Sequence, residues 1–259
     1  MPRFAANLSM MFNEVPFLDR FALARQAGFE AVEFLFPYEH PPESIRERLD
    51  GCGLRQVLFN APPGDWAGGE RGTASLPDRQ AEFRAGIETA LRYAAALGCP
   101  RLHVMGGIPG PGQSREAARA RYVANLAWAA ERCQQEGVLV LIEPINRHDM
   151  PGYILGSSDE AAAIVEAIGP ERIALQYDLY HTQITEGDLT RRAERLLPII
   201  GHMQLADVPH RHEPGTGEIA WDYVLGRIDA MGYRGWIGCE YRPAGETVAG
   251  LGWIERFRA

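Results

Sequence analysis

Short apolar segments alternate with longer amphipathic segments along the whole chain of 259 residues. Each apolar segment is rich in β-branched or aromatic residues and is bounded by Gly or Pro, a pattern typical of buried parallel strands. Segments of this kind predict eight strands: Phe4–Ser9, Ala31–Phe36, Gln56–Asn60, Leu102–Gly106, Val138–Glu143, Ile173–Asp178, Ile200–Asp207 and Trp236–Tyr241.

The amphipathic segments between these strands predict helices. Their ranges are Phe17–Ala27, Ser44–Leu49, Arg79–Leu97, Ser114–Glu136, Ser158–Ile168, Leu189–Leu196 and Trp221–Met231. Several of them end at a glycine just before the next strand, as at Gly98 and Gly137, because Gly adopts the left-handed conformation at little cost. Ser158, which precedes two acidic residues, marks the start of one helix as an N-cap region.

Eight strands with helices between them and no linker favour one (β/α)8 TIM barrel, an α/β fold, with residues 1–259 as a single domain. A doubly wound open sheet is the alternative, but no Gly-x-Gly-x-x-Gly follows the first strand. The polar, Gly-rich segment 61–77 follows the third strand and is predicted to lack regular structure. In a barrel it lies on the active-site face, either as a lid closed by Trp66 or as an ordinary surface loop.

Composition excludes several classes of protein. All 26 basic residues are Arg, and without Lys the chain cannot be a Schiff-base aldolase, a pyridoxal-phosphate enzyme or a Walker-type nucleotide-binding protein. The net charge of −8 gives no global attraction to nucleic acid. The four cysteines are far apart and predict free thiols in a reducing compartment.

The expected location follows from the absence of targeting signals. The N-terminal segment has no signal-peptide pattern, and no apolar stretch reaches the length of a membrane span. We therefore expect a cytoplasmic protein without a membrane or nucleic-acid partner. The predicted helical exterior is compatible with a homo-oligomer.

The last four strands each carry a carboxylate or an amide near the C-terminal end: Glu143, Asp178, Gln204 and Glu240. If these side chains point inward, they converge at the mouth of the barrel. Three nearby carboxylates repel one another without a cation. Together with an amide oxygen they form an all-oxygen ligand set that suits one Mg²⁺ or Mn²⁺. A solvated loop residue or a helix cap is the alternative for each one, and four positions in compatible register disfavour it.

Long motifs in the second half of the chain add a specific resemblance. The segments EPINRHDMPGY (143–153), QYDLYHTQ (176–183), HMQLADVPHRHEPGTGEI (202–219) and GCEYRPAGET (238–247) resemble the hydroxypyruvate isomerase family of xylose-isomerase-like barrels, which includes 2-oxo-tetronate isomerases. The similarity extends over nearly the whole chain. It implies that Glu143, Asp178, Gln204 and Glu240 bind one divalent ion. It also implies that Glu143 and Glu240 act as proton donor and acceptor.

Cationic side chains follow the ends of the same strands. Three carboxylates and one divalent ion sum to −1, so the carboxylate of a small anionic hydroxy-keto acid needs cations of its own. The candidates for substrate binding are His181, Arg211, His212 and Arg147. His202 lies one layer below Gln204 and is predicted to be a core histidine.

Motifs and resemblance together imply a metal-dependent aldose–ketose type isomerase. It would interconvert hydroxypyruvate and tartronate semialdehyde (2-hydroxy-3-oxopropanoate) through an enediolate, without an organic cofactor. Isomerisation of a four-carbon 2-oxo-tetronate by the same steps stays open, and so does ketose 3-epimerisation, although typical epimerases have His in place of Gln204. Metal-assisted hydrolysis, as in the related apurinic endonuclease, predicts more histidine ligands and a basic groove. A barrel without activity predicts loss of the acidic residues.

Overall fold

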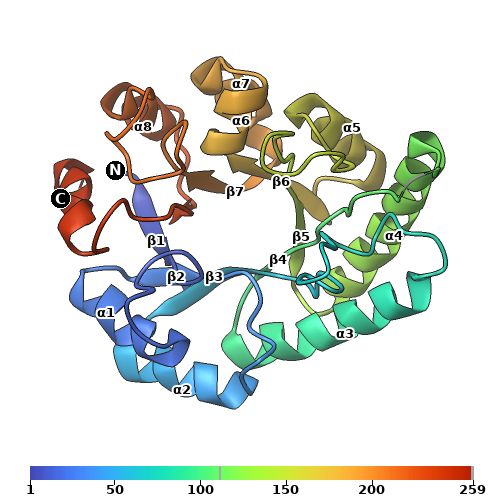
Figure 1. Cartoon of the computed structure of the whole chain (residues 1–259), viewed down its shortest axis with the longest axis horizontal. Coiled ribbons are helices and arrows are strands. Elements are labelled where there is room, and N and C mark those ends of the chain that lie inside the picture. The colour runs from blue at the N-terminus through green and yellow to red at the C-terminus, as the bar shows by residue number, and fades with distance from the viewer. Residues whose placement is uncertain (111, 258–259) are drawn as a thin grey trace.

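A closed barrel of eight parallel strands forms the centre of the computed structural model, which describes residues 1–110 and 112–257 (Figure 1). The strands follow one another in chain order, and the last pairs with the first. They are β1 (Arg3–Asn7), β2 (Ala31–Glu33), β3 (Arg55–Asn60), β4 (Arg101–His103), β5 (Leu139–Ile142), β6 (Ile173–Asp178), β7 (Ile200–Leu205) and β8 (Trp236–Cys239). The predicted (β/α)8 barrel is confirmed.

Helices surround the barrel on its outer side (Figure 1). The α-helices are α1 (Arg20–Gln26), α2 (Pro42–Cys52), α3 (Gln80–Leu97), α4 (Arg115–Gln135), α5 (Ser158–Ile168), α6 (Leu179–Thr185), α7 (Leu189–Leu196) and α8 (Trp221–Ala230). Short 3-10 helices are η1 (Phe17–Asp19), η2 (Leu197–Ile199) and η3 (Ala249–Phe257). In the described part of the chain, no helix is long and apolar enough to cross a membrane.

The sequence pattern missed α6 because this helix follows β6 without a turn. Asp178 ends the strand and caps the helix, since its Oδ1 accepts a hydrogen bond from the backbone N of Tyr180. The cap of α5 also differs from the prediction. Ser157, not Ser158, accepts a hydrogen bond from the backbone N of Glu160. Caps depend on the backbone path, which neighbouring serines do not distinguish.

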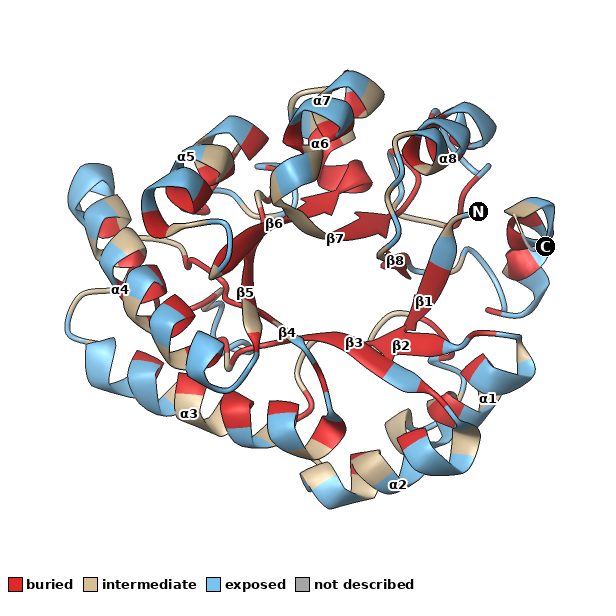
Figure 2. Cartoon of the chain, turned by 180° about the vertical axis from the view of Figure 1, so that it is seen from behind, coloured by how far each residue is buried: buried red, intermediate tan, exposed pale blue. Residues whose placement is uncertain are grey.

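Two separate apolar layers hold the barrel together. The larger lies between the sheet and the helices, whose inner faces are buried and outer faces exposed (Figure 2). The second lies inside the barrel, where a small cluster joins Leu58, Leu141 and Ala174. Because the interior is filled with side chains, a small molecule can bind only at one of its ends.

Contacts to the barrel and to itself fix the segment 61–77, which contains no helix or strand. The ring of Trp66 lies 4.9 Å from the ring of Phe36. The guanidinium of Arg71 stacks on the ring of Trp66, 4.0 Å from its centre. Nearer the end of the segment, the backbone oxygen of Ala74 accepts a hydrogen bond from the side chain of Asn125. These contacts hold Trp66 over one end of the barrel.

Candidate active site

Three carboxylates converge at the C-terminal end of the strands. Glu143 directly follows β5, Asp178 is the last residue of β6, and Glu240 directly follows β8. One ligand atom from each, together with one from His181, lies within 4.8 Å of all the others. Each carboxylate is at most 5% exposed. The sequence-predicted carboxylates therefore form one buried cluster.

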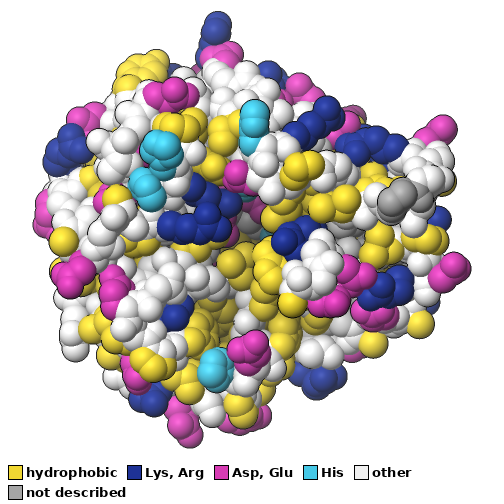
Figure 3. Space-filling model, in the orientation of Figure 1, with side chains coloured by type: hydrophobic (Ala, Val, Ile, Leu, Met, Phe, Trp, Pro, Cys, Tyr) yellow, Lys and Arg dark blue, Asp and Glu magenta, His cyan; other side chains and the backbone are white. Residues whose placement is uncertain are grey.

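The cluster borders a cavity of about 300 Å³. Its lining includes Glu143, Glu240, His181 and Arg211, and Trp66 from the segment 61–77. Figure 3 shows a group of arginine side chains beside a hollow near the middle of this face of the molecule. A cavity with acidic groups on one side and arginines beside them suits a small anionic ligand.

Burial dominates the electrostatics of the carboxylates. It raises the pKa of Glu143 well above its ordinary value, and the charges of Glu240 and Asp178 raise it further. Burial also raises the pKa of Asp178 to about 6 and that of Glu240 to about 8, although the charge of Arg211 opposes both shifts. Without an additional cation, Glu143 and Glu240 hold protons near neutral pH.

Arg211 is the cation that faces this cluster. One of its guanidinium nitrogens pairs with Glu240 and lies 3.5 Å from Asp178 Oδ2. Burial acts to lower the pKa of Arg211, but the charges of Glu240 and Asp178 outweigh it and raise the pKa above the ordinary value. One arginine cannot neutralise three carboxylates, so the cluster still lacks positive charge.

The loop after β7 fixes the position of Arg211. The buried carboxylate of Asp207 accepts hydrogen bonds from the backbone N atoms of Val208, Gly215 and Gly217, at 2.9 to 3.0 Å. Arg211 itself adopts the left-handed backbone conformation, with φ of 57°. A residue with a Cβ pays conformational strain there, and such strain concentrates at binding sites.

The ligand atoms fit a divalent ion that prefers oxygen. Among the described residues, Glu143 Oε1 and Asp178 Oδ2 have no hydrogen-bond partner although both are buried. Gln204 pairs in register with Asp178, so both side chains lie on the same side of the sheet. The amide nitrogen of Gln204 donates to Glu33, and its oxygen accepts from Gln176. A carbonyl oxygen has two lone pairs, so this oxygen retains one for an ion.

Asn146 determines which nitrogen of His181 carries the proton. The side-chain oxygen of Asn146 accepts from the backbone N atoms of His148 and Asp149, at 3.0 and 2.9 Å. Its NH2 group therefore lies toward His181 Nδ1, at 2.7 Å, and this ring nitrogen must accept. The proton then sits on Nε2, 3.6 Å from Asp178 Oδ2. A protonated nitrogen cannot bind a metal, so His181 Nε2 is a hydrogen-bond donor in this site.

Glu33 is a further buried carboxylate beside the site, and the sequence analysis did not single it out. Its oxygens accept from the side chains of Asn7 and Gln204 and lie 2.7 Å from His202 Nε2. His202 is fully buried, and the prediction of a core histidine is confirmed. Gly238 leaves the necessary space, because a Cβ there would lie 2.2 Å from Glu33 Oε2. The sequence carries a signal for Glu33, because a charged residue within a predicted buried strand is unusual.

Five polar residues that were not predicted also line the cavity: Ser9, Asn13, Asn60, His103 and Arg242. His103 ends β4 and Asn60 ends β3, and both lie within predicted strands. Arg242 follows Glu240 by two residues. A polar residue at the end of a predicted strand was thus a sufficient signal for Asn60 and His103.

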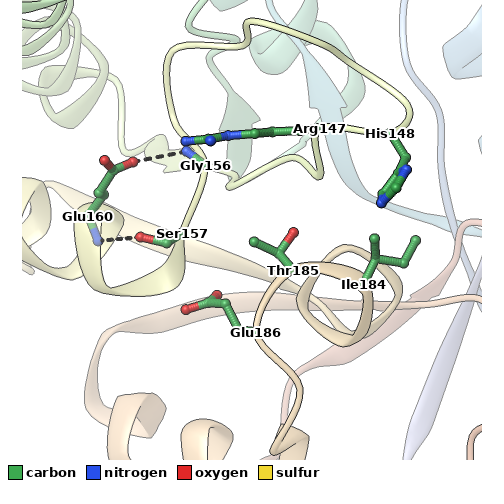
Figure 4. A pocket seen from close by; sticks show the side chains of 8 residues that line it. All are labelled: Arg147, His148, Gly156, Ser157, Glu160, Ile184, Thr185 and Glu186. Atoms are coloured by element: carbon green, nitrogen blue, oxygen red, sulfur yellow. Dashed lines mark hydrogen bonds between the residues drawn. The ribbon is translucent and has the colours of Figure 1, made fainter.

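The four predicted substrate contacts divide into two pairs. His181 and Arg211 line the cavity. His212 does not line it, and its Nδ1 lies 2.7 Å from the backbone oxygen of Arg242. Arg147 is exposed and lines a different pocket, which also contains Glu160 and Glu186 (Figure 4). The structure therefore brings only the first pair next to the carboxylate cluster.

The pocket in Figure 4 lies at the N-terminus of α5, where an anion would ordinarily bind. Its backbone donors already have acidic partners. The backbone N of Gly156 donates to Glu160, and that of Ser158 donates to Glu186. This pocket is therefore not a second anion site.

Comparisons with known proteins agree with the geometry. A family profile described as xylose isomerase-like TIM barrel matches residues 21–257. The chain is 54% identical to the 2-oxo-tetronate isomerase of Cupriavidus necator, over 99% of each chain. It is 46% identical to the hydroxypyruvate isomerase of Escherichia coli, over 100% of each. A crystal structure described as AP endonuclease, family 2, from Brucella melitensis is 49% identical and superimposes over 100% of both chains with a TM-score of 0.96.

Removal of divalent ions should destabilise the protein more at pH 8 than at pH 5. In the metal-free protein, the raised pKa values of Asp178 and Glu240 mean that the folded state binds protons more tightly than the unfolded chain. The free energy of unfolding therefore falls as the pH rises from about 4 to about 8. An ion held by these oxygens prevents this loss of stability, and the affinity of the site for the ion rises with pH.

Thermal unfolding with EDTA or with Mn²⁺, at both pH values and constant ionic strength, measures this effect. We expect the difference in melting temperature to be larger at pH 8 by at least about 3 °C. An equal difference at both pH values would show that a bound ion does not neutralise the charge of these carboxylates.

Substitution of Asn146→Asp should change the tautomer of His181. A carboxylate oxygen in place of the amide NH2 group accepts a hydrogen bond, so the proton moves to Nδ1 or the ring becomes charged. Long-range ¹H–¹⁵N NMR of the histidine rings reports which nitrogen is protonated. Asn13→Asp is the control, because Asn13 lines the same cavity and is not hydrogen-bonded to His181. Unchanged ring signals in Asn146→Asp would contradict the assignment.

Proposed function

Because the chain belongs to the family of xylose isomerase-like TIM barrels, and is an isomerase of its hydroxypyruvate isomerase group, we propose its reaction from the site. The substrate is a short 2-oxo acid that carries a hydroxyl group on C3. Hydroxypyruvate, converted to tartronate semialdehyde, is the first candidate. The four-carbon 2-oxo-tetronate, named for the relative from Cupriavidus necator, is the second.

One observation carries this proposal: the carboxylate cluster and two arginines border the same cavity. Arg211 already pairs with Glu240, whereas Arg242 has no ion pair among the described residues that would neutralise it. A backbone hydrogen bond of 2.9 Å, from Arg242 N to the oxygen of Arg211, holds the two arginines next to each other. A substrate carboxylate bound by Arg242 would have its C2 and C3 atoms next to Glu143 and Glu240.

The two glutamates supply the proton transfers that isomerisation needs. One carboxylate takes a proton from C3, and a glutamate returns a proton to C2, while the hydroxyl proton passes from O3 to O2. The oxygens of Glu143 and Glu240 that could share an ion lie within 4.8 Å of each other. Both can therefore reach adjacent carbon atoms of one small substrate. His181, with its proton on Nε2, donates a hydrogen bond to a substrate oxygen between them.

We propose that Glu143, Asp178, Gln204 and Glu240 hold one divalent ion, Mg²⁺ or Mn²⁺. The buried oxygens Glu143 Oε1 and Asp178 Oδ2, which have no hydrogen-bond partner among the described residues, support this proposal. When bound, such an ion supplies positive charge to the substrate oxygens on which negative charge develops as the carbon-bound proton leaves. It also keeps the glutamates ionised, so that one of them can act as a base. No organic cofactor is needed.

Two other reactions fit the cavity less well. Ketose 3-epimerisation uses a neutral substrate, which has no carboxylate for the two arginines that border the cavity. Hydrolysis of DNA with three zinc ions needs several histidine ligands. In the described part of the chain, the potential metal-binding group has a single histidine, His181, and its hydrogen bonds make it a donor. The chain's charge of −8 also opposes binding to a nucleic acid.

The remaining expectations from the sequence stay proposals. We propose that residues 1–259 act as one domain, in the cytoplasm, on a free small molecule and without a nucleic-acid or membrane partner. Assembly into a homo-oligomer is compatible with the exposed outer faces of the helices (Figure 2). The substrate contacts predicted for Arg147 and His212 also remain proposals.

Replacement of Glu240→Gln should abolish turnover and preserve the fold. The amide still offers an oxygen to an ion but cannot accept a proton from carbon. The expected loss in kcat is about 10²- to 10⁴-fold, the usual contribution of a general acid–base group. The control is Glu246→Gln, an exposed residue of the same loop. Activity of Glu240→Gln within about threefold of the parent would remove Glu240 from the mechanism.

Replacement of Arg242→Ala should lower kcat/KM selectively for the acid substrate. Loss of a charge-assisted hydrogen bond costs roughly 1.5–3 kcal/mol, or about 10- to 150-fold in kcat/KM. A neutral ketose such as fructose, which is expected to react slowly, should be almost unaffected. The matched control is Arg92→Ala, on the exposed side of α3. Equal losses on the acid and the ketose would show that Arg242 does not bind a carboxylate.

A further inference from the structure

Asn60 and His103 form a polar wall on the side of the cavity that the mechanism does not use. They are the last residues of β3 and β4, and they pair in register, so both side chains lie on the same side of the sheet. Both line the cavity. In a closed barrel of eight strands in chain order, β3 and β4 lie opposite β7 and β8. The wall therefore faces the loops that carry Arg211 and Arg242.

His103 is a buried polar side chain without a partner. It is 1% exposed, and neither ring nitrogen forms a hydrogen bond with any described residue. The nearest charged atom, Glu143 Oε2, lies 3.7 Å from Nδ1, which is too far for a hydrogen bond. Buried polar groups are nearly always hydrogen-bonded, so an unpartnered one that lines a cavity indicates a missing ligand.

The chemistry of the wall identifies the group that would bind there. Both ring nitrogens of His103 are without a partner, and an imidazole nitrogen can donate or accept a hydrogen bond. The amide of Asn60 likewise offers both a donor and an acceptor. A hydroxyl group both donates and accepts, and thus matches this wall. A second carboxylate or a phosphate would lose its hydration there and would lie beside the carboxyl group of Glu143.

We propose that Asn60 and His103 bind the hydroxyl group on the fourth carbon of the substrate and thereby select a four-carbon 2-oxo acid over hydroxypyruvate. This proposal rests on the function proposed above. If Arg242 binds the carboxylate, and C2 and C3 lie beside the two glutamates, the next carbon extends across the cavity toward β3 and β4. Hydroxypyruvate ends at C3 and would leave His103 unpartnered, as it is here.

The variant His103→Phe tests this proposal because it keeps a ring of similar size and removes both nitrogens. We expect kcat/KM for 2-oxo-tetronate to fall roughly 10- to 100-fold, the usual effect of an unpaired substrate hydroxyl. The value for hydroxypyruvate should stay within about threefold. His103→Gln, which restores a donor and an acceptor, should recover part of the loss. Asn60→Ala should act in the same direction, and serves if His103→Phe does not fold.

Binding of unreactive acids gives a second readout that does not require turnover. Isothermal titration in the presence of Mn²⁺ compares erythronate and threonate, which have four carbons, with glycerate, which has three. His103→Phe should weaken the binding of whichever four-carbon acid the parent protein binds more tightly. The affinity for glycerate should stay within about threefold. The control is Met231→Leu, a volume-conserving change away from the cavity, which should leave the affinity for both three- and four-carbon acids unchanged.

The outcomes separate this proposal from the proposed function. Equal losses on three- and four-carbon acids would assign His103 to the positioning of Glu143 and overturn the proposal. Unchanged values for both acids would also overturn it, as would parent protein that binds glycerate as tightly as the four-carbon acids. If the parent protein isomerises neither acid, the proposed function fails, and the titrations alone then decide whether the wall binds a hydroxyl group.

Discussion

The burial of like charges at one end of the barrel is the constraint on which the rest of the site depends. Glu143, Asp178 and Glu240 lie too close together and too far from water to be ionised at once. The fold lowers this cost in part, because Arg211 is fixed beside the cluster by a strained backbone conformation. A divalent ion would remove the remainder, which is the physical argument for the proposed metal site.

The inward side chain at the end of each strand assigns a role to each half of the barrel. All eight are polar and at most 5% exposed: Asn7, Glu33, Asn60, His103, Glu143, Asp178, Gln204 and Glu240. Those of β5 to β8 carry the oxygens that we propose for an ion and for proton transfer. Those of β1 to β4 are amides or an imidazole, apart from Glu33, which lies 2.7 Å from His202 Nε2. In these proposals, the groups for proton transfer and for the ion lie on one side of the cavity, and the groups for the C4 hydroxyl lie on the other.

The sequence predicted the barrel and the carboxylate cluster because both depend on local patterns. A buried strand is a short apolar run, and a polar residue at its end stands out against that run. Glu33 and His103 carry the same signal, but three carboxylates and an amide on four consecutive strands form a stronger pattern in the second half of the chain. The arginines that reach the cavity were harder to predict, because Arg147 and Arg242 both follow a strand closely. Only the path of each loop decides that Arg242 reaches the cavity and Arg147 does not.

The loop after β5 links proton transfer to the charge of the site. It carries both Glu143 and Asn146, so one short segment places a candidate base and fixes the proton of His181. His103 and His181, the two rings next to Glu143, are neutral because burial lowers the pKa of each. Neither ring can therefore offset the burial that raises the pKa of Glu143. Under the proposed mechanism, positive charge must therefore come from Arg211 and from the proposed ion, and Glu143 would act as a base at neutral pH only with that ion bound.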